Sequence, residues 1–153
     1  MSLVFSTMNL VVLPVWLAMI LFPRAKITQR IIASPFIVLP IALVYIALVL
    51  PVLGEVLPLV LQPELDEIAP LLGEERGATI SWMHFLAFDL FVGRWVFLDA
   101  QPRLAARELS PWLLSPVLFC VLMLGPLGLT LYFALRVTLL RTTTPSAAPR
   151  GRA

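Results

Sequence analysis

Three ionisable side chains lie within a single apolar stretch of the chain, and they are the residues best suited to do chemistry. The stretch runs from Ala78 to Leu98 and contains His84, Asp89 and Arg94. Histidine and aspartate can exchange protons, and a guanidinium can bind or orient a carboxylate. An ionisable residue inside a membrane-spanning segment is by default a functional one, because its charge must be compensated there. We therefore take these three residues as the candidate functional site.

Each of the three also has a plain structural interpretation. Asp89 lies near the middle of the stretch, where a charge costs about 2.5–3.5 kcal/mol on insertion scales. Arg94 lies close to one end, so its long side chain either extends to the membrane surface or pairs inside the bundle. His84 is either a proton-exchanging group or a hydrogen-bonded packing residue. We expect Asp89 to face the bundle interior with a polar partner from another helix, and Asp89→Leu to remove activity while folding is kept.

The spacing of these residues indicates where their partners come from. Five positions separate His84 from Asp89, and five more separate Asp89 from Arg94, which is about 1.4 turns of an α-helix in each case. No straight helix places all three on one face, and a pair between Asp89 and Arg94 within the helix is strained. The partners must therefore come from other helices, and we expect neighbouring helices to enclose this one.

The composition predicts that the surrounding elements are membrane-spanning helices. Of 153 residues, 60% are hydrophobic and 13% charged, whereas soluble domains carry about 25% charged residues. We expect an all-α integral membrane bundle of four transmembrane helices, kinked at their prolines. This single domain covers residues 1–141, and residues 142–153 are expected to be a disordered tail. Four apolar stretches reach the length of about 20 residues that a crossing needs, and they are Leu3 to Phe22, Ile31 to Leu53, Ala78 to Leu98 and Trp112 to Leu135.

The connections between these stretches differ in charge. The first and third are basic and the second, residues 54–77, is acidic, so the positive-inside rule places the first and third in the cytoplasm and both termini outside. The basic residues of the tail argue against that orientation. The second connection holds either a short interfacial helix, starting near Pro63, or a solvated connector. The bases of the first and third connections are Arg24, Lys26, Arg30, Arg103 and Arg107, and the acids of the second are Glu55, Glu64, Asp66, Glu67, Glu74 and Glu75.

Five polar side chains from all four stretches share one half of the bilayer, the half nearer the acidic connection. Polar groups in hydrocarbon must bond to one another or to water. We therefore expect a cleft that narrows toward Asp89 and is roofed by residues 63–77. The alternative is that each hydroxyl bonds to a carbonyl of its own helix and that no cavity exists. The five side chains, taken as ligand-binding candidates, are Asn9, Tyr45, His84, Thr130 and Tyr132.

Aromatic residues crowd the third stretch, and three of them complete the ligand-binding set. Trp82, Phe85 and Phe88 either pack within the bundle or line a groove for a flat conjugated ligand, and Trp82 also fits an interfacial aromatic belt. The chain has no metal-ligand spacing, no glycine-rich phosphate loop and no nucleophile elbow. We expect no metal, no cofactor and no nucleic-acid partner, and the single Cys120 allows no internal disulfide.

Four segments follow one another in an order that resembles a known family. They are the run from Asn9 to Trp16, the acidic connection from Glu64 to Glu75, the Trp-x-His-Phe-Leu-x-Phe-Asp-Leu-Phe-Val-Gly-Arg-Trp run from Trp82 to Trp95, and Gly125-Pro-Leu-Gly128. Together they resemble the abscisic-acid-deficient-four-like membrane family, whose plant members are the neoxanthin synthases. The similarity extends over about residues 3–133.

The resemblance implies a four-helix membrane protein linked to carotenoids. The plant branch is associated with converting the epoxide of violaxanthin into the allene of neoxanthin, a rearrangement without net redox change. Such chemistry suits a cofactor-free acid–base site, with Asp89 and His84 as acid and base and Arg94 orienting the carboxylate.

Two functions follow from that resemblance. The first is a carotenoid- or isoprenoid-associated membrane protein that isomerises epoxy-carotenoids. The alternative is a non-catalytic subunit that binds pigment or lipid and stabilises a larger, photosynthetic membrane complex with its partner subunits. Either function places a multi-pass protein in a bacterial inner or photosynthetic membrane, in contact with membrane lipid.

Overall fold

The computed structural model describes residues 1–143, and all regular structure in that range is helical. The all-α class is therefore confirmed. Most of the tail expected from residue 142 lies outside the described residues. In chain order the elements are α1 (Ser2–Leu21), α2 (Lys26–Ala33), the 3₁₀ turn η1 (Pro35–Val38), α3 (Leu39–Val49), the 3₁₀ turn η2 (Leu50–Val52), α4 (Leu53–Leu61), α5 (Leu65–Gly73), α6 (Glu75–Ala105) and α7 (Pro111–Thr143).

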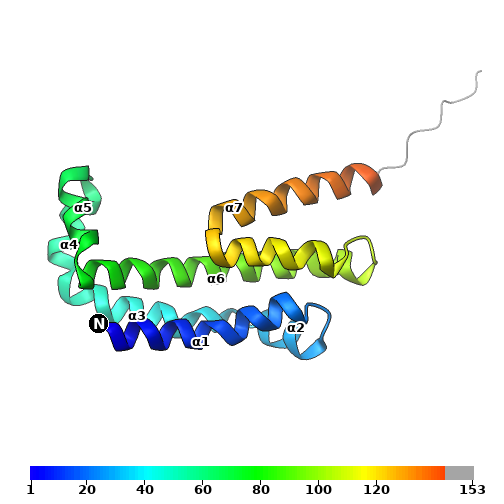
Figure 1. Ribbon diagram of the computed structural model, residues 1–153, viewed down its shortest axis with the longest axis horizontal. Coiled ribbons are helices and arrows are strands. Elements are labelled where there is room, and N and C mark those ends of the chain that lie inside the picture. The colour runs from blue at the N-terminus through cyan, green and yellow to red at the C-terminus, as the bar shows by residue number, and fades with distance from the viewer. Residues whose placement is uncertain (144–153) are drawn as a thin grey trace, which may run out of the picture.

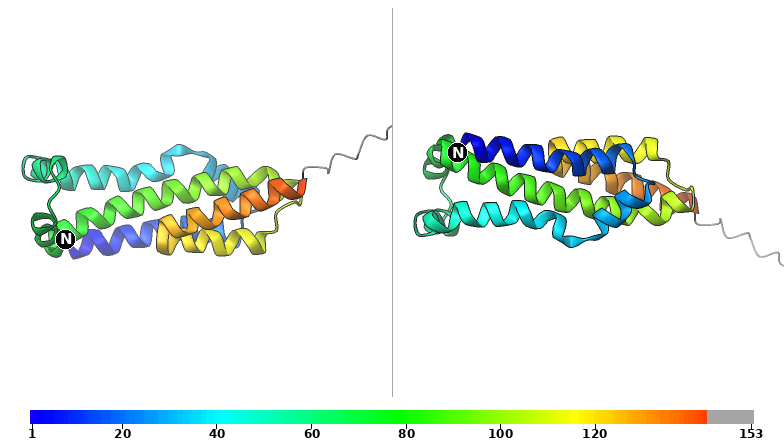
Figure 2. Two further views of the ribbon diagram at one scale, coloured as in Figure 1. Left: turned by 90° about the horizontal axis from the view of Figure 1, so that it is seen from above. Right: turned by 90° about the horizontal axis from the view of Figure 1, so that it is seen from below.

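Helix α6, which carries the candidate functional site, is the central element of the bundle (Figure 1, Figure 2). It packs against α1, α2, α3, α5 and α7. Gly93 is one reason for the close packing, because a Cβ at this position would overlap the indole ring of Trp16 from α1. Neighbouring helices therefore enclose α6 only in part, because Phe85, Phe88 and Phe91 leave one face of it exposed. The fully buried side chains of α6 include Met83, Leu90, Val96, Phe97 and Ala100.

Three segments are long and apolar enough to cross a membrane: Ser2–Leu21, Pro35–Leu61 and Pro111–Leu139. Many of their large apolar side chains are exposed, among them Leu10, Leu43 and Leu131. Such exposure is expected where the surrounding solvent is lipid rather than water. The protein is thus membrane-associated. Helix α6 is not in this set, since it carries four ionisable side chains between His84 and Asp99.

Helix α7 differs from the expected fourth crossing, because it reverses direction halfway. Leu124 has non-helical backbone angles (φ −146°, ψ 51°), and it separates a first limb, residues 111–123, from a second limb, residues 125–143. Gly125 lies against the carboxylate of Asp89, near the middle of α6. Tyr132, further along the second limb, bonds to Asp99, nearer the end of α6 from which the first limb started. Figure 1 shows the two limbs side by side as a helical hairpin.

The residues around Leu124 explain why α7 reverses direction there. Pro126 has no N–H to donate to the preceding turn, and proline disfavours helical angles at the residue before it. Gly128 then allows the limbs to touch, because a Cβ there would overlap the backbone of Cys120 and Val121. The prolines of a membrane helix were expected to kink it; here the Gly125–Gly128 segment folds the chain back on itself.

The hairpin changes which segments share an end of the bundle. The N-terminus lies at the end that holds α4 and α5, and α7 finishes at the opposite end, beside the 22–25 and 106–110 connections (Figure 1). In the described chain the N-terminus and the end of α7 therefore lie at opposite ends (Figure 1), which does not support the expectation that both termini face the same side. The short helix expected in the acidic connection is present as α5, with Asp66 and Glu67 in its first turn.

Candidate functional site

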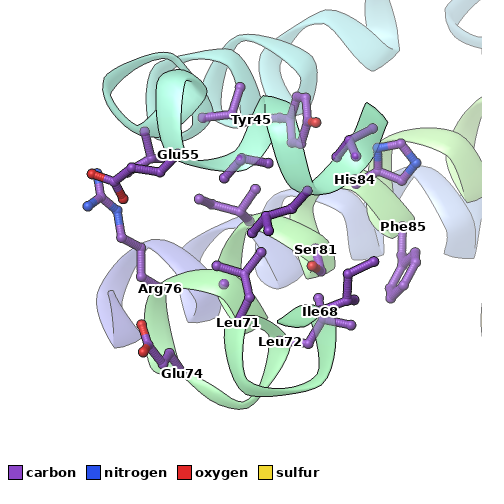
Figure 3. A pocket seen from close by; sticks show the side chains of 17 residues that line it. Tyr45, Glu55, Ile68, Leu71, Leu72, Glu74, Arg76, Ser81, His84 and Phe85 are labelled. Carbon is purple, nitrogen blue, oxygen red and sulfur yellow. The ribbon is translucent and has the colours of Figure 1, made fainter. Parts of the chain in front are cut away.

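A cavity of about 300 Å³ lies at the acidic end, enclosed by α3, α4, α5 and α6. Its walls are mainly apolar, and Tyr45, Ser81 and His84 are the uncharged polar side chains among them. Glu55, Glu74 and Arg76 also line it, and Figure 3 shows them on the side away from His84. The apolar lining residues are Val49, Val52, Val56, Leu59, Val60, Ile68, Leu71, Leu72, Gly77, Ile80 and Phe85.

His84 is held among aromatic rings at the inner side of this cavity. Its imidazole stacks on Phe88, with ring centroids 4.6 Å apart, and contacts the edge of Tyr45 at 5.6 Å. Phe85 lies edge-on at 6.2 Å. These contacts limit the orientations of the imidazole, which is exposed and lines the cavity at the side away from Glu55, Glu74 and Arg76 (Figure 3).

A cavity is present at the expected end, but it does not narrow toward Asp89, and only two of the five expected polar side chains line it. It is covered by α5, as predicted, and both Tyr45 and His84 line it. Asn9 lies elsewhere, where it accepts a hydrogen bond from Trp82 Nε1 at 3.1 Å and donates one to the Phe5 carbonyl at 2.7 Å. Thr130 follows the alternative interpretation, since its hydroxyl donates to the Pro126 carbonyl of its own helix at 2.8 Å.

Asp89 does not line the cavity. Its side chain is half-buried, and its carboxylate packs against Gly125 at the tip of the α7 hairpin. It therefore faces another helix, as expected. Within residues 1–143, however, the carboxylate has no hydrogen bond or ion pair, so the expected polar partner is missing.

Arg94 binds the end of a helix rather than an acid. Its Nε donates to the carbonyls of Ile32 at 2.9 Å and Ser34 at 3.2 Å, and its terminal nitrogen donates to that of Ala33 at 2.7 Å. These carbonyls lie at the C-terminus of α2, where unpaired acceptors and the negative end of the helix dipole favour a cation. Arg94 thus pairs inside the bundle, and it does not orient Asp89.

A second polar cluster, centred on Asp99, was not predicted. Tyr132 donates a hydrogen bond to Asp99 Oδ2 at 2.6 Å. The same oxygen forms ion pairs with Arg103 at 3.3 Å and with Arg136 at 3.2 Å. Trp95 lies edge-on to the Tyr132 ring at 5.8 Å. The i,i+4 spacing of Asp99 and Arg103 could have shown that pair, but the contacts with Tyr132 and Arg136 depend on the hairpin.

Comparison with known proteins identifies the chain's relatives. The model of the family described as ABA DEFICIENT 4-like matches residues 3–132. The chain belongs to this family. The matched range extends from α1 through the hairpin tip to Tyr132, so it includes the central helix, the cavity and the reversal in α7.

One relative of this ABA DEFICIENT 4-like chain is Protein ABA DEFICIENT 4, chloroplastic, from Arabidopsis thaliana. The two are 31% identical over 139 residues, which cover 86% of this chain and 60% of the relative. The chain therefore spans about three fifths of the length of the curated relative that it matches. No solved structure matches it.

Arg94 is expected to stabilise this ABA DEFICIENT 4-like protein through its three hydrogen bonds to the end of α2. We predict that Arg94→Lys lowers the free energy of unfolding by about 1.5–3 kcal/mol, because an ammonium cannot reach three carbonyls as the planar guanidinium does. Thermal unfolding in detergent measures the change. Arg30→Lys is the control, since Arg30 is exposed and has no partner among the described residues. Equal losses in both variants would show that the α2 carbonyls do not matter.

Proposed function

We propose that the protein binds a carotenoid or a related isoprenoid. The cyclic end group of this ligand would lie in the cavity that His84 and Tyr45 line. The main support is the cavity itself, a mainly apolar space in which His84 and Tyr45 lie together, apart from the charged residues at the other side (Figure 3). Binding sites for small molecules have this character, with few polar groups among apolar walls. The resemblance of the sequence to the neoxanthin synthases supports the carotenoid class.

The size of the cavity favours an end group over a whole carotenoid. About 300 Å³ is the lower limit of common ligand pockets. A long polyene chain would continue outside it, along the face of α6 on which Phe85 and Phe88 are 54% and 57% exposed. Flat aromatic rings at the membrane-facing surface are suitable partners for a conjugated chain.

The proposed chemistry uses His84 and Tyr45 instead of His84 and Asp89. The two rings are in contact, and both line the cavity, whereas Asp89 and Arg94 do not. In an epoxide-to-allene rearrangement, the Tyr45 hydroxyl would protonate the epoxide oxygen as its C–O bond breaks. Neutral His84 would remove the vinylic proton, whose electron pair forms the new double bond, and would then return a proton to Tyr45. Atoms and electrons balance without a redox partner.

We infer an orientation from the charges at the two ends. Lys and Arg favour the cytoplasmic side of a membrane. Because of the hairpin, the last turns of α7 lie at the same end of the bundle as the basic first and third connections. Arg136 therefore adds to the positive charge of this end. We propose that α1, η1–α4 and α6 cross the membrane, that α7 enters and leaves on the basic side, and that the cavity opens on the opposite side.

His84 provides the test of the catalytic proposal. In the purified full-length chain with an epoxy-carotenoid, we expect His84→Gln to lower the turnover rate by about 100-fold or more, the usual contribution of a general acid–base group. Bound pigment should remain, because glutamine keeps a polar side chain of similar size at this position and the apolar lining is unchanged. Chromatography of extracted pigments measures both quantities. Thr130→Val is the control, since Thr130 bonds only within its own helix, and its turnover should match the unmodified protein.

Two results would contradict the enzymatic proposal. A turnover rate that His84→Gln leaves unchanged would show that the imidazole takes no part in the reaction. Bound pigment without turnover, together with stable co-purification of a pigment–protein complex, would favour the non-catalytic subunit.

A further inference from the structure

A second cavity lies at the basic end of the bundle, on the opposite end from His84. Its volume is about 620 Å³. It is enclosed by the 22–25 connection, α2, the last turns of α6 and the start of the 106–110 connection. Four of its lining residues are polar, namely Arg24, Gln29, Gln101 and Arg107, and four are apolar or small, namely Leu98, Pro102, Leu104 and Ala105.

The two amides hold the backbone around this cavity. Gln101 Nε2 donates to the Pro23 carbonyl at 3.3 Å and to the Phe97 carbonyl at 3.2 Å. Gln29 Nε2 contacts the Arg24 carbonyl at 3.4 Å. These bonds satisfy acceptors of the 22–25 connection with neutral groups. The charged side chain of Arg24 is consequently not needed to hold its own loop.

Both guanidinium groups at the cavity lack a partner. Among the described residues, neither Arg24 nor Arg107 forms a hydrogen bond or an ion pair through its side chain, and both are exposed. Arg107 also has a backbone φ of 61°, a left-handed conformation that non-glycine residues adopt uncommonly. The loop therefore keeps an arginine in a costly conformation without an internal contact for its charge.

No acid of this end neutralises the two arginines. Asp99 is already paired with Arg103 and Arg136. Glu108, the neighbour of Arg107, is exposed and forms no ion pair among residues 1–143. Helix α2 also begins here without an acid in its first turn, so the positive end of its dipole adds to the field.

We propose that this cavity binds the phosphate of an anionic phospholipid headgroup. Two guanidinium groups line this one cavity, and their charge suits a phosphate, which arginine binds through paired hydrogen bonds. Leu98, which is partly exposed, provides an apolar surface beside them, as an amphiphile requires. The basic end is also where anionic headgroups of the cytoplasmic leaflet would meet the protein. A soluble phosphate ester offers the same phosphate without the acyl chains.

The test measures lipid binding to the purified full-length chain in detergent by native mass spectrometry. The probes are dioleoylphosphatidylglycerol, dioleoylphosphatidylcholine and soluble glycerol 3-phosphate. The unmodified protein should retain phosphatidylglycerol in preference to phosphatidylcholine. The double variant Arg24→Gln/Arg107→Gln should bind phosphatidylglycerol about 30-fold more weakly, because it loses the charge-assisted hydrogen bonds of both guanidinium groups to the phosphate. Its binding of phosphatidylcholine should stay the same.

The matched control removes the same charge from the same end. Lys26→Gln/Arg30→Gln changes two exposed cations that do not line the cavity, and it should alter the affinity less than about threefold. An equal loss in both double variants would overturn the proposal, because only diffuse charge would then matter. Displacement of the lipid by glycerol 3-phosphate would overturn the lipid as the ligand. Arg24→Lys/Arg107→Lys keeps the charge and should show an intermediate loss even if the glutamine variant unfolds.

Discussion

Replacement of Gly128 by alanine is expected to destabilise the protein by about 3 kcal/mol or more, at or above the upper limit usual for overpacking. The added methyl group would overlap backbone atoms of Cys120 and Val121. Backbone cannot rotate away as the end of a long side chain can, so the two limbs of α7 must separate. Thermal unfolding in detergent, followed by far-ultraviolet circular dichroism, measures the loss.

Gly54 offers a matched control for this substitution. A Cβ at Gly54 would meet nothing within 4 Å, and alanine in a helix is favoured over glycine by up to about 1 kcal/mol. Gly54→Ala should therefore leave stability equal or slightly raised. If Gly128→Ala were equally harmless, the limbs would not be in contact, and α7 would be the straight crossing that its composition first suggests. Labelling of cysteines placed at Ser2 and Thr143 from opposite sides of the membrane would then show both on one side.

Much of the helical layout could be predicted from hydrophobicity alone. The expected first crossing, residues 3–22, is displaced by one residue from α1 (Ser2–Leu21), and the expected third lies wholly within α6 (Glu75–Ala105). The fourth is helical and apolar as expected, but its reversal was not predicted, because a proline after glycine indicates an interruption without fixing its angle. Whether the chain continues or turns back depends on the contact between Gly128 and Val121, and no local pattern encodes that contact.

The candidate site was predicted in part for a related reason. Depth along each stretch correctly placed Tyr45 and His84 at one level, where their rings are in contact. The same arithmetic placed Tyr132 beside them, but the reversal carries it to Asp99. Arg94 was correctly expected to find partners on another helix. Those partners are backbone carbonyls, which every residue has, so the sequence could not identify them.

Asp99→Asn is expected to cost about 2–4 kcal/mol of stability, somewhat below the range for breaking a fully buried pair. The substitution removes the charge that Arg103 and Arg136 share. Their side chains are 17% and 36% exposed, so water can replace only part of the lost interaction. The hydrogen bond from Tyr132 also weakens, because its acceptor is no longer ionised. The second limb of α7 should detach first, and chemical unfolding curves would record the loss.

Replacement of Asp89 by asparagine should have the opposite effect on the free energy of unfolding. Asp89 has no ion pair or hydrogen bond within the described chain, and its carboxylate lies near the middle of α6, beside Gly125. A charge at mid-membrane depth costs about 2.5–3.5 kcal/mol, and asparagine removes it at nearly constant volume. Asp89→Asn should therefore leave the free energy of unfolding unchanged or raise it. A loss as large as that of Asp99→Asn would contradict this, and it would mean that the carboxylate, charged or protonated, holds the tip of the hairpin against α6.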